Sequence, residues 1–162
     1  KHNSVSSALD YLRSMPRMGR NNLILADVQG HLAVFESGRH RFGLFETRQG
    51  TLVNTNHFAS TEMRDCFIDM DPPEARGRTF RRHEVVTAAL SASPCPIDIP
   101  FAQYLMATHN GPLASLCCHP EASSKMTTIS TSIFLPAQRR LLFCHGLPCQ
   151  GRYDDFIVEG AA

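Results

Sequence analysis

Near the N-terminus, apolar residues recur with the period of an α-helix. Positions i, i+3, i+4 and i+7 of one helix face are occupied by Val5, Ala8, Leu9 and Leu12. Ser4 or Ser6 can cap the first turn, because serine hydroxyls accept hydrogen bonds from the free amides of a helix start. Pro16 and Gly19 end the pattern. The sequence therefore predicts an amphipathic helix at the start of the fold.

Short runs with strand-like patterns come next. They span Asn22–Asp27, His31–Glu36, Arg41–Thr47 and Thr51–Asn56. Gly30 and Gly50 lie at the turns and permit the chain to reverse, so we predict four antiparallel strands. Phe42 and Leu44 fall on one face of the sheet and Phe45 on the other, which indicates cover on both sides. That pattern is typical of a layered sandwich.

Two helices and further strands are predicted in the rest of the chain. A charged, proline-containing loop at residues 69–74 precedes a helix at 78–90, and prolines between 91 and 100 break that helix. A short helix follows at 101–108. The last predicted strands span residues 127–135, 140–145 and 153–158. The order of sheet, helices and sheet indicates an α+β protein in which the helices cover a sheet face.

Length and charge narrow the class of protein. A chain of 162 residues with 43% hydrophobic content fits a single domain, residues 1–162. Sixteen basic and fifteen acidic residues give a net charge of +1, so neither nucleic acid nor a membrane is expected as a partner. The apolar runs are strand-sized, too short to span a bilayer. The N-terminus lacks the pattern of a secretory signal, which favours a cytoplasmic location without fixing it.

Cysteines are numerous but do not form a known framework. They are Cys66, Cys95, Cys117, Cys118, Cys144 and Cys149. No C-x-x-C pair is present, so free and mostly buried thiols are expected. A zinc site using Cys144, His145 and Cys149 with His119 can be drawn, but C-H-x-x-x-C is not a usual ligand spacing. The expectation is therefore no metal site. The segment Cys117-Cys118-His119 could also be a nucleophile pair, although neighbouring residues rarely reach that geometry.

A polar cluster at residues 54–57, Asn-Thr-Asn-His, ends the fourth predicted strand. Amide donors at a sheet edge can hold a carbonyl oxygen while negative charge develops on it, and Asn56 is the candidate for that role. The alternative is a strand-ending turn, because Asn and Thr side chains readily bond nearby backbone groups.

The order of several blocks in the chain suggests a family. They read G-R-N-N-L-I-L-A-D-V-Q-G-H-L-A-V-F-E from Gly19, G-T-L-V-N-T-N-H-F-A-S from Gly50, T-I-S-T-S-I from Thr128 and H-G-L-P-C-Q-G-R-Y from His145. This pattern, from the helix near Ser4 to Phe156, resembles the isopenicillin N acyltransferase family of N-terminal nucleophile hydrolases. More distantly it is similar to choloylglycine and penicillin V hydrolases.

The resemblance implies a four-layer αββα sandwich of antiparallel sheets and an amide hydrolase or acyltransferase without a cofactor. Such enzymes release an N-terminal cysteine by autoproteolysis and form an acyl-enzyme on it. Because this sequence begins with Lys1, we expect it to be the C-terminal portion of a larger enzyme, inactive alone. The expected partners are a small acyl-amide substrate and a missing N-terminal segment or companion chain.

The resemblance also implies roles for individual residues. The Thr-Asn match assigns the oxyanion-binding amide to Asn56. A functional arginine at the start of a helix aligns with Arg78 or with Arg81, and we choose Arg78 to orient a substrate carboxylate. His57 and Thr131 are further substrate-site candidates, with His57 expected to pack behind the site. The alternative to an enzyme is a non-catalytic fragment of the same fold that binds a ligand or a partner chain.

Overall fold

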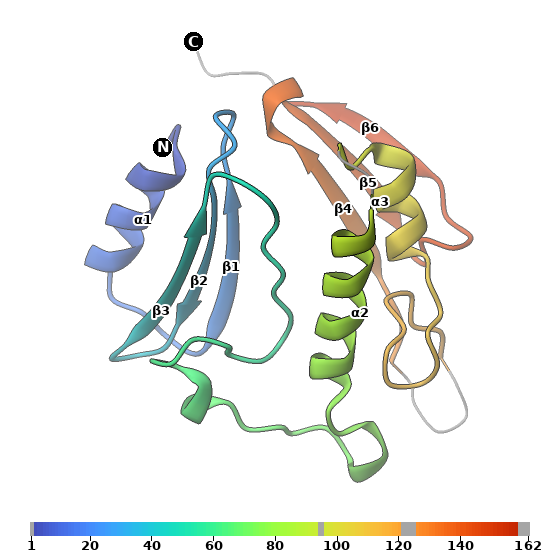
Figure 1. Ribbon diagram of the computed structural model, residues 1–162, viewed down its shortest axis with the longest axis horizontal. Coiled ribbons are helices and arrows are strands. Elements are labelled where there is room, and N and C mark those ends of the chain that lie inside the picture. The colour runs from blue at the N-terminus through green and yellow to red at the C-terminus, as the bar shows by residue number, and fades with distance from the viewer. Residues whose placement is uncertain (1, 94–95, 121–125, 159–162) are drawn as a thin grey trace. The chain divides into compact units, whose positions relative to one another are not determined.

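The computed structural model of the protein describes residues 2–93, 96–120 and 126–158 (Figure 1). These residues form an α+β fold with three α-helices and two three-stranded antiparallel sheets. The predicted α+β class with antiparallel sheets is therefore confirmed. The chain divides into two compact units, Lys1–His83 and Glu84–Ala162, which are described separately. That the chain forms a single domain stays a prediction.

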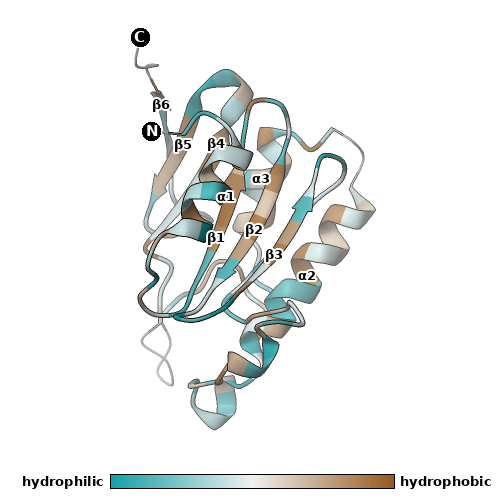
Figure 2. Cartoon of the chain, turned by 90° about the vertical axis from the view of Figure 1, so that its left-hand side faces the viewer, coloured by the Kyte–Doolittle hydropathy of each residue, from teal (hydrophilic) through white to brown (hydrophobic). Residues whose placement is uncertain are grey.

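The first unit is a sheet covered by a helix. Strands β1 (Asn21–Ala26), β2 (Leu32–Ser37) and β3 (Phe42–Thr47) pair antiparallel in the order β1-β2-β3, and helix α1 (Val5–Ser14) lies beside them (Figure 1). Apolar residues run along β1 and β2 (Figure 2). The core between helix and sheet consists of Val5, Leu9, Ala33 and Phe35, with Leu12, Leu25, Phe42 and Leu44 packed against it. The predicted helix stripe is thus the buried face.

The start of α1 is fixed by two side chains. The Ser4 hydroxyl accepts a hydrogen bond from Ser7 N at 3.2 Å, which confirms Ser4 as the cap. The Asp27 carboxylate accepts from Val5 N at 3.0 Å and also from Gln29 N and His31 N in the turn between β1 and β2. The bond from Val5 N is the main reason that the pKa of Asp27 lies below its ordinary value. Asp27 therefore joins the helix to the hairpin.

The predicted fourth strand is wrong. Residues 51–56 form no strand, and the backbone groups that a ladder would use are bonded by side chains instead. The Asn22 amide donates to Thr55 O at 2.7 Å and to His57 O at 3.0 Å. The Thr79 hydroxyl accepts from Asn56 N at 2.9 Å. The segment is therefore attached to β1 and to the first turn of a helix by side chains.

A buried carboxylate connects the central strand to the next loop. Glu36 on β2 is fully buried, and its two oxygens accept hydrogen bonds from Ala59 N at 2.6 Å, Ser60 N at 3.0 Å and Ser60 Oγ at 2.6 Å. Gly43 on β3 makes room for this contact, because a Cβ there would lie 1.9 Å from Ser60 Oγ. A buried carboxylate is tolerated only when donors satisfy it, and here three do so.

The loop then continues through two short 3-10 helices, η1 (Arg64–Cys66) and η2 (Pro73–Ala75), to helix α2 (Arg78–Ala92). Residues 78–83 of α2 belong to the first unit and residues 84–92 to the second. In the second unit, α3 (Ile99–Met106) is capped by the Asp98 side chain, which accepts from Phe101 N.

The sheet of the second unit is a meander of β4 (Ser130–Leu135), β5 (Arg140–His145) and β6 (Tyr153–Ile157). A 3-10 turn, η3 (Pro136–Gln138), joins β4 to β5 in a hairpin, and Arg139 after it adopts the left-handed conformation with φ of 52°. The Arg140–Asp155 ion pair links β5 to β6. These three strands match the predicted ones within a few residues.

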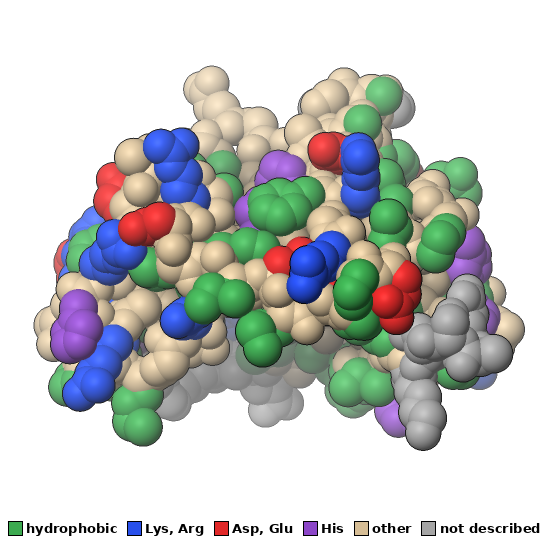
Figure 3. Space-filling view, turned by 90° about the horizontal axis from the view of Figure 1, so that it is seen from below, with side chains coloured by type: hydrophobic (Ala, Val, Ile, Leu, Met, Phe, Trp, Pro, Cys, Tyr) green, Lys and Arg blue, Asp and Glu red, His purple; other side chains and the backbone are tan. Residues whose placement is uncertain are grey.

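Acidic and basic side chains are interspersed on the face shown in Figure 3, in keeping with the net charge of +1. Among the described residues, no helix has the length and apolar character needed to cross a bilayer.

Replacing Glu36 by Gln keeps the size of the side chain but turns an NH₂ group toward amides that need an acceptor. We expect Glu36→Gln to lower the free energy of unfolding by about 2–3 kcal/mol, because bonds to a charged acceptor are lost. Chemical denaturation of the purified protein measures this. Glu62→Gln, at an exposed position, is the matched control and should change stability by no more than ~0.5 kcal/mol. Equal effects of the two changes would contradict the role of Glu36.

Candidate active site

The candidate site of the first unit is built around Asn56, where the segment 55–57 meets the first turn of α2. The Thr55 hydroxyl donates to Thr79 O at 3.0 Å, and the Thr79 hydroxyl donates to Thr55 Oγ1 at 2.9 Å. Thr79 Oγ1 in turn accepts from Asn56 N at 2.9 Å. Thr79 is buried, so this exchange of bonds fixes the backbone of Asn56 against the helix start.

The side chain of Asn56 is oriented by Arg82. The Nη2 atom of Arg82 donates to Oδ1 of Asn56 at 2.6 Å. Because a guanidinium carries only donors, it must meet the carbonyl end of the amide, and this settles which way the amide faces. The Nδ2 group of Asn56, which is the donor that an oxyanion needs, is thereby turned away from Arg82. Asn56 itself is exposed and can reach a ligand.

The ring of His57, the next residue in the chain, is buried. Its Nδ1 is 3.0 Å from Thr55 Oγ1 and 3.2 Å from Thr79 Oγ1. Since both hydroxyls donate elsewhere, the hydrogen-bond network assigns the proton to Nδ1, and it donates best to the nearer oxygen, Thr55 Oγ1. The ring also packs against aromatic rings, 4.2 Å from the Phe80 centroid and 6.1 Å from that of Phe67.

The surroundings of His57 favour the neutral ring. Burial is the main cause that lowers the pKa of His57 below its ordinary value, and the charges of His83 and Arg82 act in the same direction. The neutral ring bonds the hydroxyls of Thr55 and Thr79, and Thr79 Oγ1 in turn accepts from Asn56 N. The position of His57 behind a substrate site stays a prediction, and so does its contact with substrate.

The two other predicted site residues are Arg78 and Thr131. Arg78 is the first residue of α2 and half-buried, while Arg82, one turn further along the same helix, is the arginine that reaches Asn56. Thr131 belongs to the second unit, buried on β4 opposite Cys144 of β5. Thr79 was not among the residues predicted from the sequence, and Arg82 was one member of a basic run, with Arg76, Arg78 and Arg81, in which Arg78 was chosen. The i, i+3 spacing of Thr79 and Arg82 on the predicted helix was the available signal.

The alternative nucleophile pair in Cys117-Cys118-His119 has little support. The Cys117 Sγ atom is 3.8 Å from Nε2 of His119, and the same nitrogen lies closer, at 3.2 Å, to Cys149 Sγ outside this segment. Cys117 is also buried, and burial is the main reason that the pKa of its thiol is raised. A raised thiol pKa reduces the fraction of thiolate, which is the reactive form.

The fold and the oriented amide thus define an α+β protein with a candidate oxyanion-binding site. The family model described as acyl-coenzyme A:6-aminopenicillanic acid acyl-transferase matches residues 1–150, and the chain belongs to this family. No curated protein gives a significant match. Members of the family are acyltransferase or amidase enzymes, so membership indicates an enzyme of that kind. The resemblance stated from the sequence is confirmed at the level of the family.

The buried, neutral His57 makes stability depend on pH in a defined direction. Its pKa is lowered in the folded state from 6.5, so its contribution is fully present above about pH 6.5 and is lost as the pH falls through the lowered value. We expect the melting temperature to drop on acidification, and His57→Gln to flatten that part of the profile. Exposed His40 supplies the control, since His40→Gln should follow the unmodified protein. Parallel profiles for all three proteins would refute the assignment.

Proposed function

We propose that the protein is the part of an amide hydrolase or acyltransferase that binds the oxyanion, and that the acyl-enzyme forms on an N-terminal cysteine outside these 162 residues. The observation that carries the proposal is the fixed orientation of Asn56. Its side-chain oxygen accepts a hydrogen bond from Arg82, and its backbone N–H donates to Thr79. Family membership supports the reaction class.

The proposed reaction begins with attack of the cysteine thiolate on the amide carbon of the substrate, with the free α-amine as base. The carbonyl oxygen gains the negative charge, and Asn56 Nδ2 donates to it. When the C–N bond breaks, the proton held by the α-amine moves to the leaving amine, and a thioester remains. Water or a second amine then attacks the thioester and releases the free thiol.

Preorganisation is the reason that Asn56 suits this step. A donor lowers the barrier most when it needs no reorientation as the charge develops. The Asn56 backbone N–H is bonded to Thr79 and the side-chain oxygen of Asn56 is bonded to Arg82. Together these two bonds orient the side-chain amide before any substrate arrives. Arg78 is proposed to orient a substrate carboxylate, for which a guanidinium offers two parallel donors. Thr131 is a further substrate-site candidate in the proposal, as is His57, and the intact enzyme would have the four-layer sandwich.

The nucleophile is tested by expressing the protein from its complete reading frame and measuring intact masses and N-terminal sequences. We expect cleavage that exposes an N-terminal cysteine, and an uncleaved chain when that cysteine is changed to alanine. The matched control is Cys66→Ala. This change should leave cleavage unchanged, because Cys66 lies inside the chain, in η1, and is not the proposed N-terminal nucleophile. A product without such a cysteine, or cleavage that survives the alanine change, would sink the proposed mechanism.

Asn56 is tested by kinetics on the processed enzyme, with a panel of acylated amino acids, penicillin-type amides and bile-acid conjugates. We expect Asn56→Ala to lower kcat by about 100- to 1000-fold with little change in KM, because the lost donor acts on the transition state. Arg82→Ala should lower kcat less, since the amide remains but is no longer held.

Two controls belong to this measurement. Asn54→Ala changes an amide two residues away, and Arg64→Ala changes an exposed arginine in η1. Both should stay within a few fold of the unmodified enzyme. If Asn54→Ala lowers kcat as strongly as Asn56→Ala, the oxyanion role does not belong to Asn56.

A further inference from the structure

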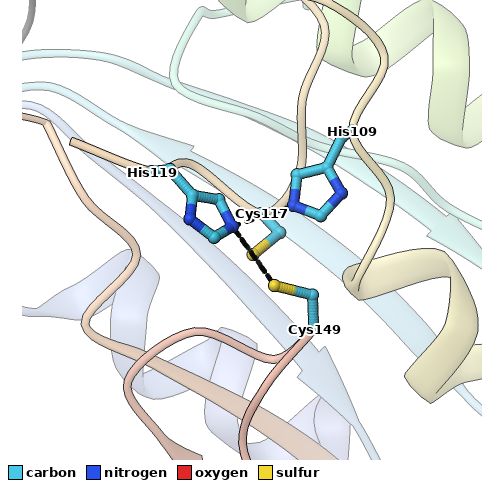
Figure 4. Close-up of side chains that lie close together, drawn as sticks. All are labelled: His109, Cys117, His119 and Cys149. Atoms are coloured by element: carbon cyan, nitrogen blue, oxygen red, sulfur yellow. Dashed lines mark hydrogen bonds between the residues drawn. The ribbon is translucent and has the colours of Figure 1, made fainter. Parts of the chain in front are cut away.

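Four potential metal ligands meet in the second unit (Figure 4). They are His109, Cys117, His119 and Cys149. His109 follows α3, Cys117 and His119 lie in the loop that continues from it, and Cys149 lies in the connection between β5 and β6. The close-up shows the four side chains pointing toward one another (Figure 4). One ligand atom from each lies within 4.8 Å of all the others.

The spacing of these atoms is close to that of a tetrahedral zinc site. Zinc bonds to sulfur and nitrogen give tetrahedron edges of about 3.8 Å between sulfurs, ~3.4 Å between nitrogens and ~3.6 Å between one of each. The two sulfurs are 3.5 Å apart and the two Nε2 atoms 3.0 Å apart. Nε2 of His119 is 3.2 Å from the Cys149 sulfur and 3.8 Å from that of Cys117. A centre can therefore bind all four with small side-chain shifts.

Hydrogen bonds alone do not account for the cluster. The Nε2 atom of His119 has three neighbours within 3.8 Å, namely His109 Nε2 and the two sulfurs. An imidazole nitrogen carries either one proton or one lone pair, so it forms one good hydrogen bond. Here one such nitrogen has three neighbours, and two of them are thiols, which become strong metal ligands when deprotonated. A cation at the centre of the group would bind all of these atoms at once.

The backbone holds the contributing loops in place. Thr108 O accepts from Leu116 N and Cys117 N at 3.2 Å and 3.1 Å, which folds the chain back so that Cys117 approaches His109. Cys118 N donates to Thr128 Oγ1, and Thr128 N donates to Cys118 O, both at 2.9 Å. On the other side, Leu147 O accepts from Gly151 N at 2.7 Å and closes the turn that carries Cys149.

We propose that His109, Cys117, His119 and Cys149 bind a zinc ion. Two thiolates and two imidazoles in a tetrahedron favour zinc among the common metals, and four protein ligands leave no open position for substrate. The ion is therefore structural, and it ties the loop after α3 to the β5–β6 connection. The proposal does not rest on the acyl-transfer mechanism.

The site departs from the expectation of no metal. Of the set that could be drawn from the sequence, His119 and Cys149 are present, while Cys144 and His145 are replaced by Cys117 and His109. His145 is exposed and Cys144 is buried beside Gly151, where a Cβ would lie 2.2 Å from its sulfur.

The test is the metal content of the protein expressed from its complete reading frame, purified under reducing conditions without a metal column. We expect about one zinc per chain, removed by a chelator and restored by added zinc. Cobalt(II) in place of zinc should give the intense d–d bands of a tetrahedral thiolate complex. This measurement needs no variant, so it does not depend on how well a variant folds.

Variants then locate the ligands. Cys117→Ser and Cys149→Ser should each weaken zinc binding at least ~100-fold and abolish the cobalt bands, and His109→Gln should do the same. Cys118→Ser and His145→Gln are neighbours outside the cluster and should retain one zinc. Acyl-transfer activity is not the readout, so failure of this site and failure of the proposed reaction are separate results.

Three outcomes overturn the proposal. The first is a reduced protein that binds neither zinc nor cobalt. The second is a protein whose mass shows a Cys117–Cys149 disulfide, with no metal taken up after reduction. The third is zinc that stays after Cys149→Ser but is lost after His145→Gln, which would place the ion among other ligands.

Discussion

The buried carboxylate of Glu36 is the interaction on which the first unit depends. It lies on the central strand, and it is fully out of water. A charge in that position is stable only while its donors are present, and all three donors come from Ala59 and Ser60 in the loop after residue 56. Gly43 on the neighbouring strand leaves the space that the contact needs. Strand, glycine and loop therefore require one another.

The Asn56 segment is held from several directions as a result. Glu36 bonds the backbone of Ala59 and Ser60, just after the segment. The side-chain amide of Asn22 donates to the carbonyls of Thr55 and His57. The Thr79 hydroxyl accepts from the backbone N–H of Asn56. None of these contacts is a strand pairing. A site built in this way holds its backbone in place while the side-chain amide of Asn56 remains exposed. A preorganised donor requires this combination.

The sequence predicted the regular elements well because their patterns are local. Helix α1 and its Ser4 cap, the first three strands and the β4–β5 hairpin all follow from periodicity and turn residues. The fourth strand failed since residues 51–56 have a strand-like pattern but their partners are the side chains of Asn22 and Thr79, far away in the chain.

Contacts between distant residues also explain what was missed at the candidate sites. Arg78 and Arg82 cannot be ranked until the helix start is placed against Asn56. The proposed metal ligands follow the spacing H-x₇-C-x-H-x₂₉-C, which contains only one short-range pair and so gives no recognisable motif. Asn56 itself was accessible from the sequence through its resemblance to a family, whereas its fixed orientation was not.

Asp27 has a consequence for how the first unit folds. Helix α1 has ten residues, fewer than the ~12–15 that an isolated helix needs in water. Its first backbone amide is bonded by a carboxylate that also shapes the β1–β2 turn. The helix and the hairpin therefore complete each other, and α1 owes its order to the hairpin against which it packs.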